Sequence, residues 1–148
     1  MTTTTTFDGQ YTTVTGDLYD DARTPNETTR LIRADIKAAI KDGTLAPGKY
    51  SVRRAAGAYR GIYATVVVPD IATAYRPVDP SSQADAQAAY RGQETVVREE
   101  IVAAGAKIRD IANRYLRSTS DVQTDYFHGG YVLVFLSSAA NGGGTVIA

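Results

Sequence analysis

The segment GYVLVFLSS at residues 130–138 constrains the fold most, because its side chains are apolar on both faces of any strand that it forms. Antiparallel strands at a surface alternate between apolar and polar residues, whereas a continuous apolar run is typical of a strand that is covered on both faces. The segment therefore predicts a buried strand at a central position in a sheet.

Residues 25–42 predict the first helix, because both of its ends carry strong signals. Thr24 and Glu27 have the spacing of a capping box, with Pro25 at the first helical position between them. Gly43 is suited to the left-handed residue that ends many helices. An apolar stripe at helical spacing joins the two ends, formed by Leu31, Ile32, Ile36, Ala39 and Ile40.

Residues 93–117 predict a second, longer helix. Its apolar residues recur at spacings of four and three, at Val97, Ile101, Ala104, Ile108, Ile111 and Tyr115. We expect this helix to lie across the sheet. The residues that we expect to be largely buried are Ile101, Ile108, Ile111, Val132, Val134 and Leu136.

The segment between the two helices predicts a β-hairpin of residues 49–54 with 59–68. Tyr50 and Val52 alternate with polar residues, and residues 59–68 are rich in β-branched and aromatic side chains. The short sequence AAGA lies between the two strands, and Pro69 ends the second one.

The N-terminus predicts another hairpin, with strands near residues 2–7 and 10–15. Asp8 and Gly9 form a strong two-residue turn signal, and the flanking threonines, Phe7 and Tyr11 favour strands. The alternative for a threonine-rich terminus is a disordered tail.

The remaining segments lie outside this framework. Prolines divide residues 70–92, which predict an insertion with a short helix at 80–91. Residues 139–148 predict a flexible tail, whose final TVIA is either a short edge strand or a frayed end. The order of elements predicts one α+β domain, with a mostly antiparallel sheet, two main helices on one face and an N-terminal β-hairpin.

The composition restricts the classes of function. The 148 residues include 16 basic and 16 acidic ones, and this balance argues against a general nucleic-acid binder but leaves room for a local basic patch. The absence of cysteine and the single histidine exclude disulfides, thiolate metal sites and multi-histidine zinc sites. We therefore expect no metal and no cofactor. We also expect no signal peptide and no membrane span, and hence a cytoplasmic location.

A group of cations and aromatics around the central hairpin is the leading candidate site. Arg53, Arg54 and Arg60 flank its turn, with Tyr59 and Tyr63 beside them. Arginine forks bind phosphates and carboxylates through two bonds, and aromatic rings stack on bases. The alternative is a solvated hairpin tip whose arginine stems lie on the sheet.

The segment TSDVQTDYFH at residues 119–128 is the second candidate. Histidine is the residue type that most often acts as a general base, which makes His128 a candidate. Asp121 and Asp125 are candidates to bind a metal ion through their carboxylate oxygens. The simpler interpretation is a corner between the long helix and the last strand, in which Asp121 caps the turn. We keep Asp125 and His128 as candidate binding residues, with no catalytic residue.

Two parts of the chain carry a family resemblance. TTRLIRADIKAAI followed by KYSVR resembles the opening of one large polyvalent protein-associated domain, and IANRYLRSTSDVQTDYFHGGYVLV resembles its close. Such domains occur in phages, plasmids and conjugative elements, so the resemblance implies delivery with incoming DNA or early action against host defences. It implies no reaction. The linker KDGTLAPG, the insertion at 70–92 and the N-terminal hairpin depart from the family pattern.

These observations favour a non-enzymatic accessory protein of a phage or mobile element. Its partner would be a host or phage protein, or a small anionic ligand. A virion-associated assembly protein is the first alternative, with homo-oligomers forming through the edge of the N-terminal hairpin. A nucleotide or nucleic-acid binder is the second. The corresponding locations are the host cytoplasm or the virion.

Overall fold

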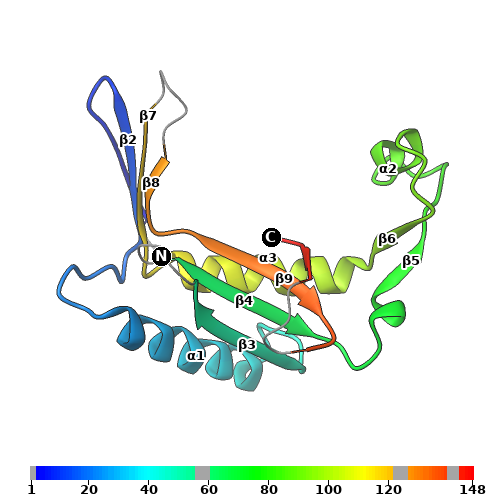
Figure 1. The fold of residues 1–148 in the computed structure, drawn as a ribbon, viewed down its shortest axis with the longest axis horizontal. Coiled ribbons are helices and arrows are strands. Elements are labelled where there is room, and N and C mark those ends of the chain that lie inside the picture. The colour runs from blue at the N-terminus through cyan, green and yellow to red at the C-terminus, as the bar shows by residue number, and fades with distance from the viewer. Residues whose placement is uncertain (1–2, 56–60, 122–126, 140–143) are drawn as a thin grey trace.

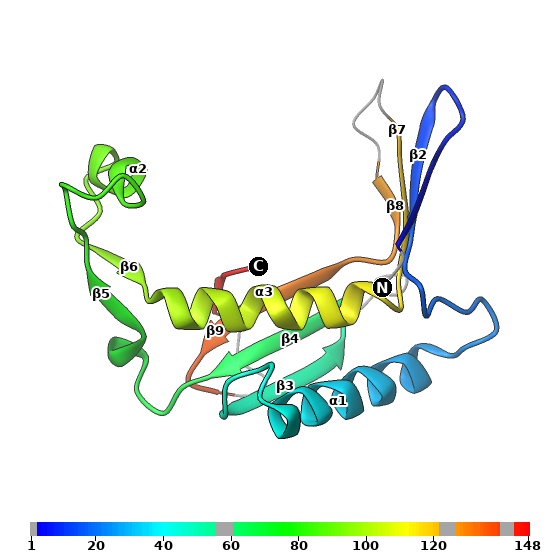
Figure 2. The same ribbon diagram turned by 180° about the vertical axis from the view of Figure 1, so that it is seen from behind.

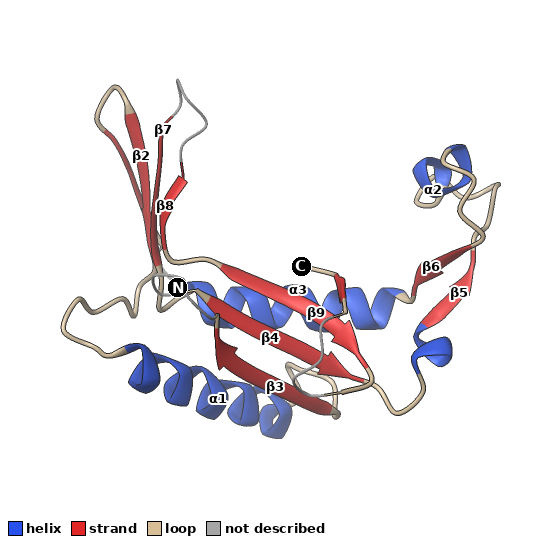
Figure 3. Cartoon of the chain, in the orientation of Figure 1, coloured by secondary structure: helices blue, strands red, loops and turns tan. Residues whose placement is uncertain are grey.

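The computed structural model describes residues 3–55, 61–121, 127–139 and 144–148. The chain is an α+β protein built around a main sheet with the strand order β10-β9-β4-β3 (Figures 1 and 3). These strands are β3 (Lys49–Arg54), β4 (Ile62–Val67), β9 (Val132–Ser137) and β10 (Thr145–Val146).

Two helices, α1 (Pro25–Asp42) and α3 (Glu99–Asn113), cover one face of the main sheet. Helix α3 lies behind β4 and β9 in Figure 1 and in front of them in Figure 2, while α1 packs against β3 and beside α3. The core lies between the helices and this face of the sheet. It is the arrangement that the sequence predicts.

Helix α1 has the predicted bounds because its end signals are local. The Thr24 hydroxyl accepts a hydrogen bond from the Glu27 amide, and the Glu27 carboxylate accepts one from the Thr24 amide. At the other end Gly43 is left-handed, with φ of 84°. The predicted stripe packs inward: Ile32, Ile36 and Ala39 are buried, and Leu31 and Ile40 are half-buried.

Alternation along the strands separates the two faces of the main sheet. Val52, Ala64 and Val134 lie side by side in the register, and all three are buried beneath the helices. The next row along, Ser51, Thr65 and Phe135, belongs to the opposite face. We call this second face the open face, because α1 and α3 do not cover it.

Strand β9 is central, as predicted, but it is not covered on both faces, because Leu133 and Phe135 are half-buried on the open face. It also runs parallel to β4. Parallel neighbours need a long crossover connection, and here the chain between β4 and β9 includes α3. The other strand pairs of the three sheets are antiparallel.

The N-terminal hairpin is present as β1 (Thr4–Phe7) and β2 (Tyr11–Thr15). Its turn lies one residue later than predicted: the Asp8 amide donates to the Tyr11 carbonyl, so Gly9 and Gln10 are the central residues. The Asp8 carboxylate also accepts from the Gln10 and Tyr11 amides. These bonds hold the pKa of Asp8 below its usual value.

The hairpin belongs to a second sheet with the order β1-β2-β7-β8. This sheet corrects the interpretation of residues 119–128 as a corner, because residues 119–121 belong to a strand. Strand β7 (Arg117–Asp121) pairs along its whole length with β2, and β8 (Phe127–Gly129) pairs with β7. The strands that pair here are about 100 residues apart in the sequence, so the local sequence could not predict this sheet. This sheet projects from one end of α3 (Figure 1).

A third, two-stranded sheet corrects both the insertion and the start of the long helix. Strand β5 (Tyr75–Pro77) pairs with β6 (Thr95–Val97), which takes three residues from the predicted helix. The 3₁₀ helix η1 (Ile71–Ala74) precedes β5, and the helix predicted at 80–91 is reduced to α2 (Ala86–Tyr90). This arm projects from the other end of α3 (Figure 1).

The predicted tail contains an edge strand and part of the core. Strand β10 pairs with β9, and the Ile147 amide donates to the Val134 carbonyl at 2.8 Å. Ile147 packs over Gly105 of α3, where an added Cβ would lie 2.8 Å from its side chain. Residues 140–143 lie outside the described ranges. No helix within those ranges combines the length and apolar character that crossing a bilayer requires.

Candidate functional site

Positive charge is concentrated in one part of a chain that is neutral as a whole. Residues 30–54 contain seven of the 16 basic residues and two of the 16 acidic ones, an excess of five positive charges. Both acids are engaged: Asp35 accepts a hydrogen bond from the Tyr115 hydroxyl, and Asp42 accepts from the amide and hydroxyl of Thr44. The segment forms α1 and β3, so the excess lies along one edge of the main sheet.

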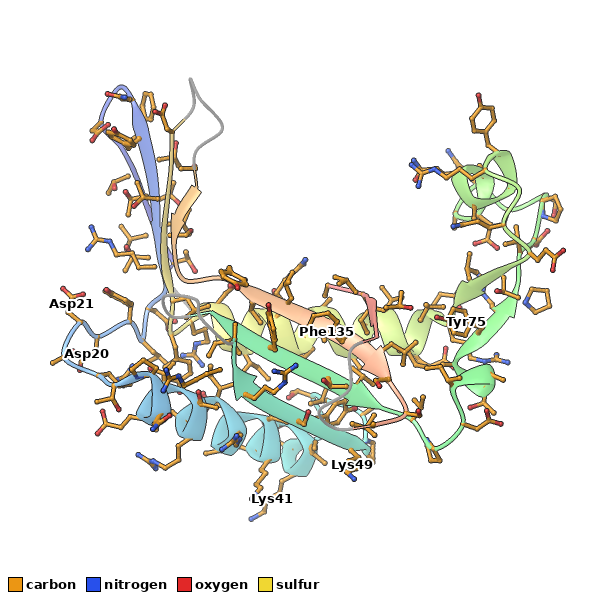
Figure 4. All side chains as sticks on the ribbon, viewed as in Figure 1. Asp20, Asp21, Lys41, Lys49, Tyr75 and Phe135 are labelled. Carbon is orange, nitrogen blue, oxygen red and sulfur yellow. The ribbon has the colours of Figure 1, made fainter. Side chains whose placement is uncertain are left out.

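A groove of about 530 Å³ runs along this edge, between α1 and β3. We call it the α1–β3 groove. Helix α1 contributes Arg33, Ile36, Lys37 and Ile40, and the approach to β3 with the strand itself contributes Gly48, Lys49, Tyr50, Ser51, Val52 and Arg53. Figure 4 labels Lys49 at the start of β3, and Lys41 at the end of α1.

Arg33 connects the two walls of the groove. Its Nε and Nη2 atoms donate to the Val52 carbonyl oxygen at 3.0 and 2.6 Å. Strand β3 is the last strand of the main sheet, so this carbonyl points away from β4 and toward α1. The arginine thus satisfies one backbone group of an edge that would otherwise face solvent.

Arg53 lies on the open face at the rim of the groove. Its guanidinium carbon is 5.0 Å from the centre of the Tyr63 ring, the geometry of a cation–π contact. Its Nε atom is buried without a hydrogen-bond partner among the described residues. Tyr63 also meets Phe135 edge to face, with ring centres 5.3 Å apart, so β4 and β9 hold this aromatic support in place.

Among the described residues, ion pairs are formed by Arg76 and Arg114, both outside the groove. Arg76 binds Asp85 and Glu99, and Arg114 binds Asp17. By contrast, Arg33, Lys37, Lys49 and Arg53 form no ion pair with any residue that the structure describes. These four positive charges are therefore available to an anionic ligand.

Tyr50 separates the groove from a second cavity of about 610 Å³. Its hydroxyl donates to the Ala46 carbonyl at 2.6 Å, and burial raises the pKa of Tyr50 above its usual value. The second cavity is mainly apolar and reaches Val66, Pro69 and Ile101. A ligand bound in the groove could therefore place an apolar side chain in this neighbouring cavity.

One of the site residues predicted from the sequence lines the groove, and others lie elsewhere or outside the described ranges. Arg53 lines the groove, whereas the exposed Arg54 donates to the Asn26 side chain at 3.3 Å. His128 lies in β8, opposite Thr119 in the second sheet. The predicted residues outside the described ranges are Tyr59, Arg60 and Asp125.

The turn that Asp121 is predicted to cap includes residues 122–126, which lie outside the described ranges. Asp121 is buried at the end of β7, and one of its oxygens accepts a bond of 3.4 Å from Gln10 Nε2. The described residues contain no group of three potential ligands that would hold a metal ion.

Sequence reasoning missed Arg33, Lys37 and Lys49. Arg33 and Lys37 occupy successive turns of α1, and only the packing of α1 against β3 brings them to Lys49 and Arg53. A count of charge along the chain would have found the region, because the excess of five falls within 25 residues. It would not have found the groove.

Comparisons of this chain with protein-family models, with curated proteins and with solved structures found no match.

Proposed function

We propose that this protein is a non-enzymatic binding protein and that its partner presents negative charge to the α1–β3 groove. The observation that carries the proposal is the set of four cations, Arg33, Lys37, Lys49 and Arg53, without acidic partners among the described residues. Arginine forks and lysine ammonium groups both bind carboxylates and phosphates.

The chemistry of the groove suits recognition. Its cations surround an apolar floor formed by Ile36, Ile40 and Val52, so a ligand gains both charge pairing and burial of apolar surface. General acid–base catalysis usually uses a carboxylate or an imidazole in the cleft, and the described lining residues include neither. Binding is therefore the better-supported activity.

The biological role that we propose follows from the family resemblance. KYSVR, which resembles the family's first strand, is β3 itself, and TTRLIRADIKAAI lies within α1. The two segments of the resembling opening thus form the walls of the groove. An accessory protein of a phage or mobile element, acting on a host or phage protein in the host cytoplasm, fits a site of this kind.

The test measures binding of a labelled poly-glutamate by fluorescence anisotropy. The groove variant carries Lys49→Ala and Arg53→Ala, and the control variant carries Arg91→Ala and Arg109→Ala, two exposed cations of α2's arm and α3. Both variants lose two positive charges. We expect the groove variant to bind at least tenfold more weakly than the control, equivalent to about 1.4 kcal/mol. Equal loss in both variants would show that the groove is not the site.

A specific observation favours a second function, that of an assembly protein. Strand β1 is exposed along its whole length, carries no charge, and has β2 as its only neighbouring strand among the described residues. Its Phe7 side chain is 63% exposed. An uncharged edge without proline favours pairing with another strand, including β1 of a second copy. Light scattering on the chain with and without residues 1–15 tests this, because assembly through β1 requires the larger mass to depend on that segment.

A further inference from the structure

We propose that the partner is an extended acidic segment of a protein, which adds to the main sheet as a new strand beside β3. The proposed strand has acidic side chains at two positions four residues apart, a small polar residue midway and apolar residues between them. This inference rests on the proposed function and specifies its ligand.

The backbone of β3 offers hydrogen-bonding groups to such a strand. In an antiparallel ladder, alternate residues direct their backbone groups to the neighbouring strand and away from it. The Ala55 amide donates to the Gly61 carbonyl at 2.9 Å, which makes 55, 53 and 51 the residues that face β4. Tyr50 and Val52 therefore face outward, and the bond from Arg33 to the Val52 carbonyl shows the same direction independently.

The side chains of β3 determine the pattern of the ligand. Lys49, Ser51 and Arg53 share the open face, whereas Tyr50 and Val52 face the helices. An added strand alternates in the same way, and its side chains stand directly opposite those of β3. Acids opposite Lys49 and Arg53 are therefore four residues apart, about 13 Å at the usual rise per residue.

The alternate residues of the added strand point toward α1. That side of the groove presents Ile36 and Ile40 with the aliphatic stem of Lys37. Valine or isoleucine at the two intervening positions would cover this surface. A nucleic-acid strand would pair its phosphates with the cations, but phosphate oxygens only accept hydrogen bonds and would supply no donor to the outward carbonyl of Tyr50. A peptide strand would pair with the cations and also with the outward backbone groups of β3.

Arg33 protects this edge in the free protein. An incoming amide takes its place at the Val52 carbonyl, and the released guanidinium then pairs with the ligand. Because the cation exchanges a neutral carbonyl for a carboxylate, the exchange favours an acidic strand over a neutral one.

Three synthetic peptides test the proposal, each labelled at one end and measured by fluorescence anisotropy. The first is Ser-Asp-Val-Thr-Val-Glu-Ser. The second replaces the valine after its aspartate with proline, which at an unchanged charge removes an N–H that would face the Val52 carbonyl in an antiparallel pairing. The third, Ser-Val-Asp-Thr-Glu-Val-Ser, has the composition of the first but places its acids two residues apart. We expect the first peptide to bind at least tenfold more tightly than either control.

Reversing the two charges of the protein and of the peptide provides a second test. The Lys49→Glu and Arg53→Glu double variant should lose the acidic peptide and bind Ser-Lys-Val-Thr-Val-Lys-Ser instead. In NMR spectra of the unmodified chain, the amide resonances of Tyr50 and Val52 should shift most on adding the first peptide, since they would gain a hydrogen-bond partner.

The outcomes separate this inference from the proposed function. Equal binding of all three peptides, together with poly-glutamate binding that depends on Lys49 and Arg53, would overturn strand addition and leave the anion site in place. Loss of that poly-glutamate dependence as well would overturn both. Tighter binding of oligothymidylate than of every peptide, again dependent on Lys49 and Arg53, would replace the peptide with a nucleic acid.

Discussion

Replacing Ile108 with alanine tests whether the core lies where α3 meets the main sheet. Ile108 is completely buried in the cluster that α3 forms with β4 and β9. The change removes three carbon atoms from this site. At about 0.8 kcal/mol for each buried methylene, the lost transfer free energy is about 2.4 kcal/mol.

A cavity adds to this loss, because the surrounding structure relaxes only in part. A residual cavity of about 50 Å³ contributes about 1.2 kcal/mol at the usual 24 cal/mol for each Å³. The expected loss in free energy of unfolding is therefore about 3.6 kcal/mol. For a chain of this size, it corresponds to a fall in melting temperature of roughly 7–14 °C.

Urea denaturation followed by circular dichroism measures the loss, and Val102→Ala is the matched control. Val102 lies on the same helix but is 41% exposed, so its replacement should change stability by no more than about 0.5 kcal/mol. A loss below about 0.5 kcal/mol for Ile108→Ala would refute the placement of this side chain in the core. Equal losses for the two variants would refute the assigned face of α3.

Three further predictions concern the helix cap, the arm and the N-terminal sheet. Thr24→Ala should lower the free energy of unfolding by about 1 kcal/mol, because it removes half of the capping box, whereas Thr24→Ser should restore most of it. The Arg76 guanidinium holds the pKa of Asp85 at about 2, below its usual value of 3.8. The stabilisation from this pair is therefore complete above about pH 4 and is lost as the pH falls toward 2. Melting temperatures of the unmodified chain and of Asp85→Asn should converge over that range, and a constant difference would contradict the assignment. Deleting residues 1–15 removes β2, one of the two strands that pair with β7, and should lower the melting temperature. Unchanged melting together with unchanged mass would show that the hairpin stabilises nothing.

Part of the candidate site was predictable from local sequence patterns, and the rest arises from packing between distant elements. Arg53 was predictable from the sequence, because alternation along KYSVR puts it on the polar face of a strand beside the predicted turn. Its neighbours Arg33 and Lys37 belong to a helix whose outer face is generally charged, so no local signal distinguishes them from solvated residues. The groove exists because α1 packs against the edge strand.

The sequence by itself determined the elements whose signals are short-ranged. Helix α1 has the predicted bounds because its capping box, apolar stripe and terminal glycine all act within a few residues. The same holds for the N-terminal hairpin and for the pairing of β3 with β4, because each pair consists of strands that follow one another closely in the sequence.

Only the tertiary structure decided the ends of α3 and the partners of the distant strands. Residues 95–97 continue the helical pattern, but their β-branched side chains also suit a strand, and pairing with β5 favours the strand. Residues 117–121 likewise became β7 because β2 supplies a partner about 100 residues away. Backbone hydrogen bonds with remote partners stabilise these segments, and a local pattern does not contain the position of a remote partner.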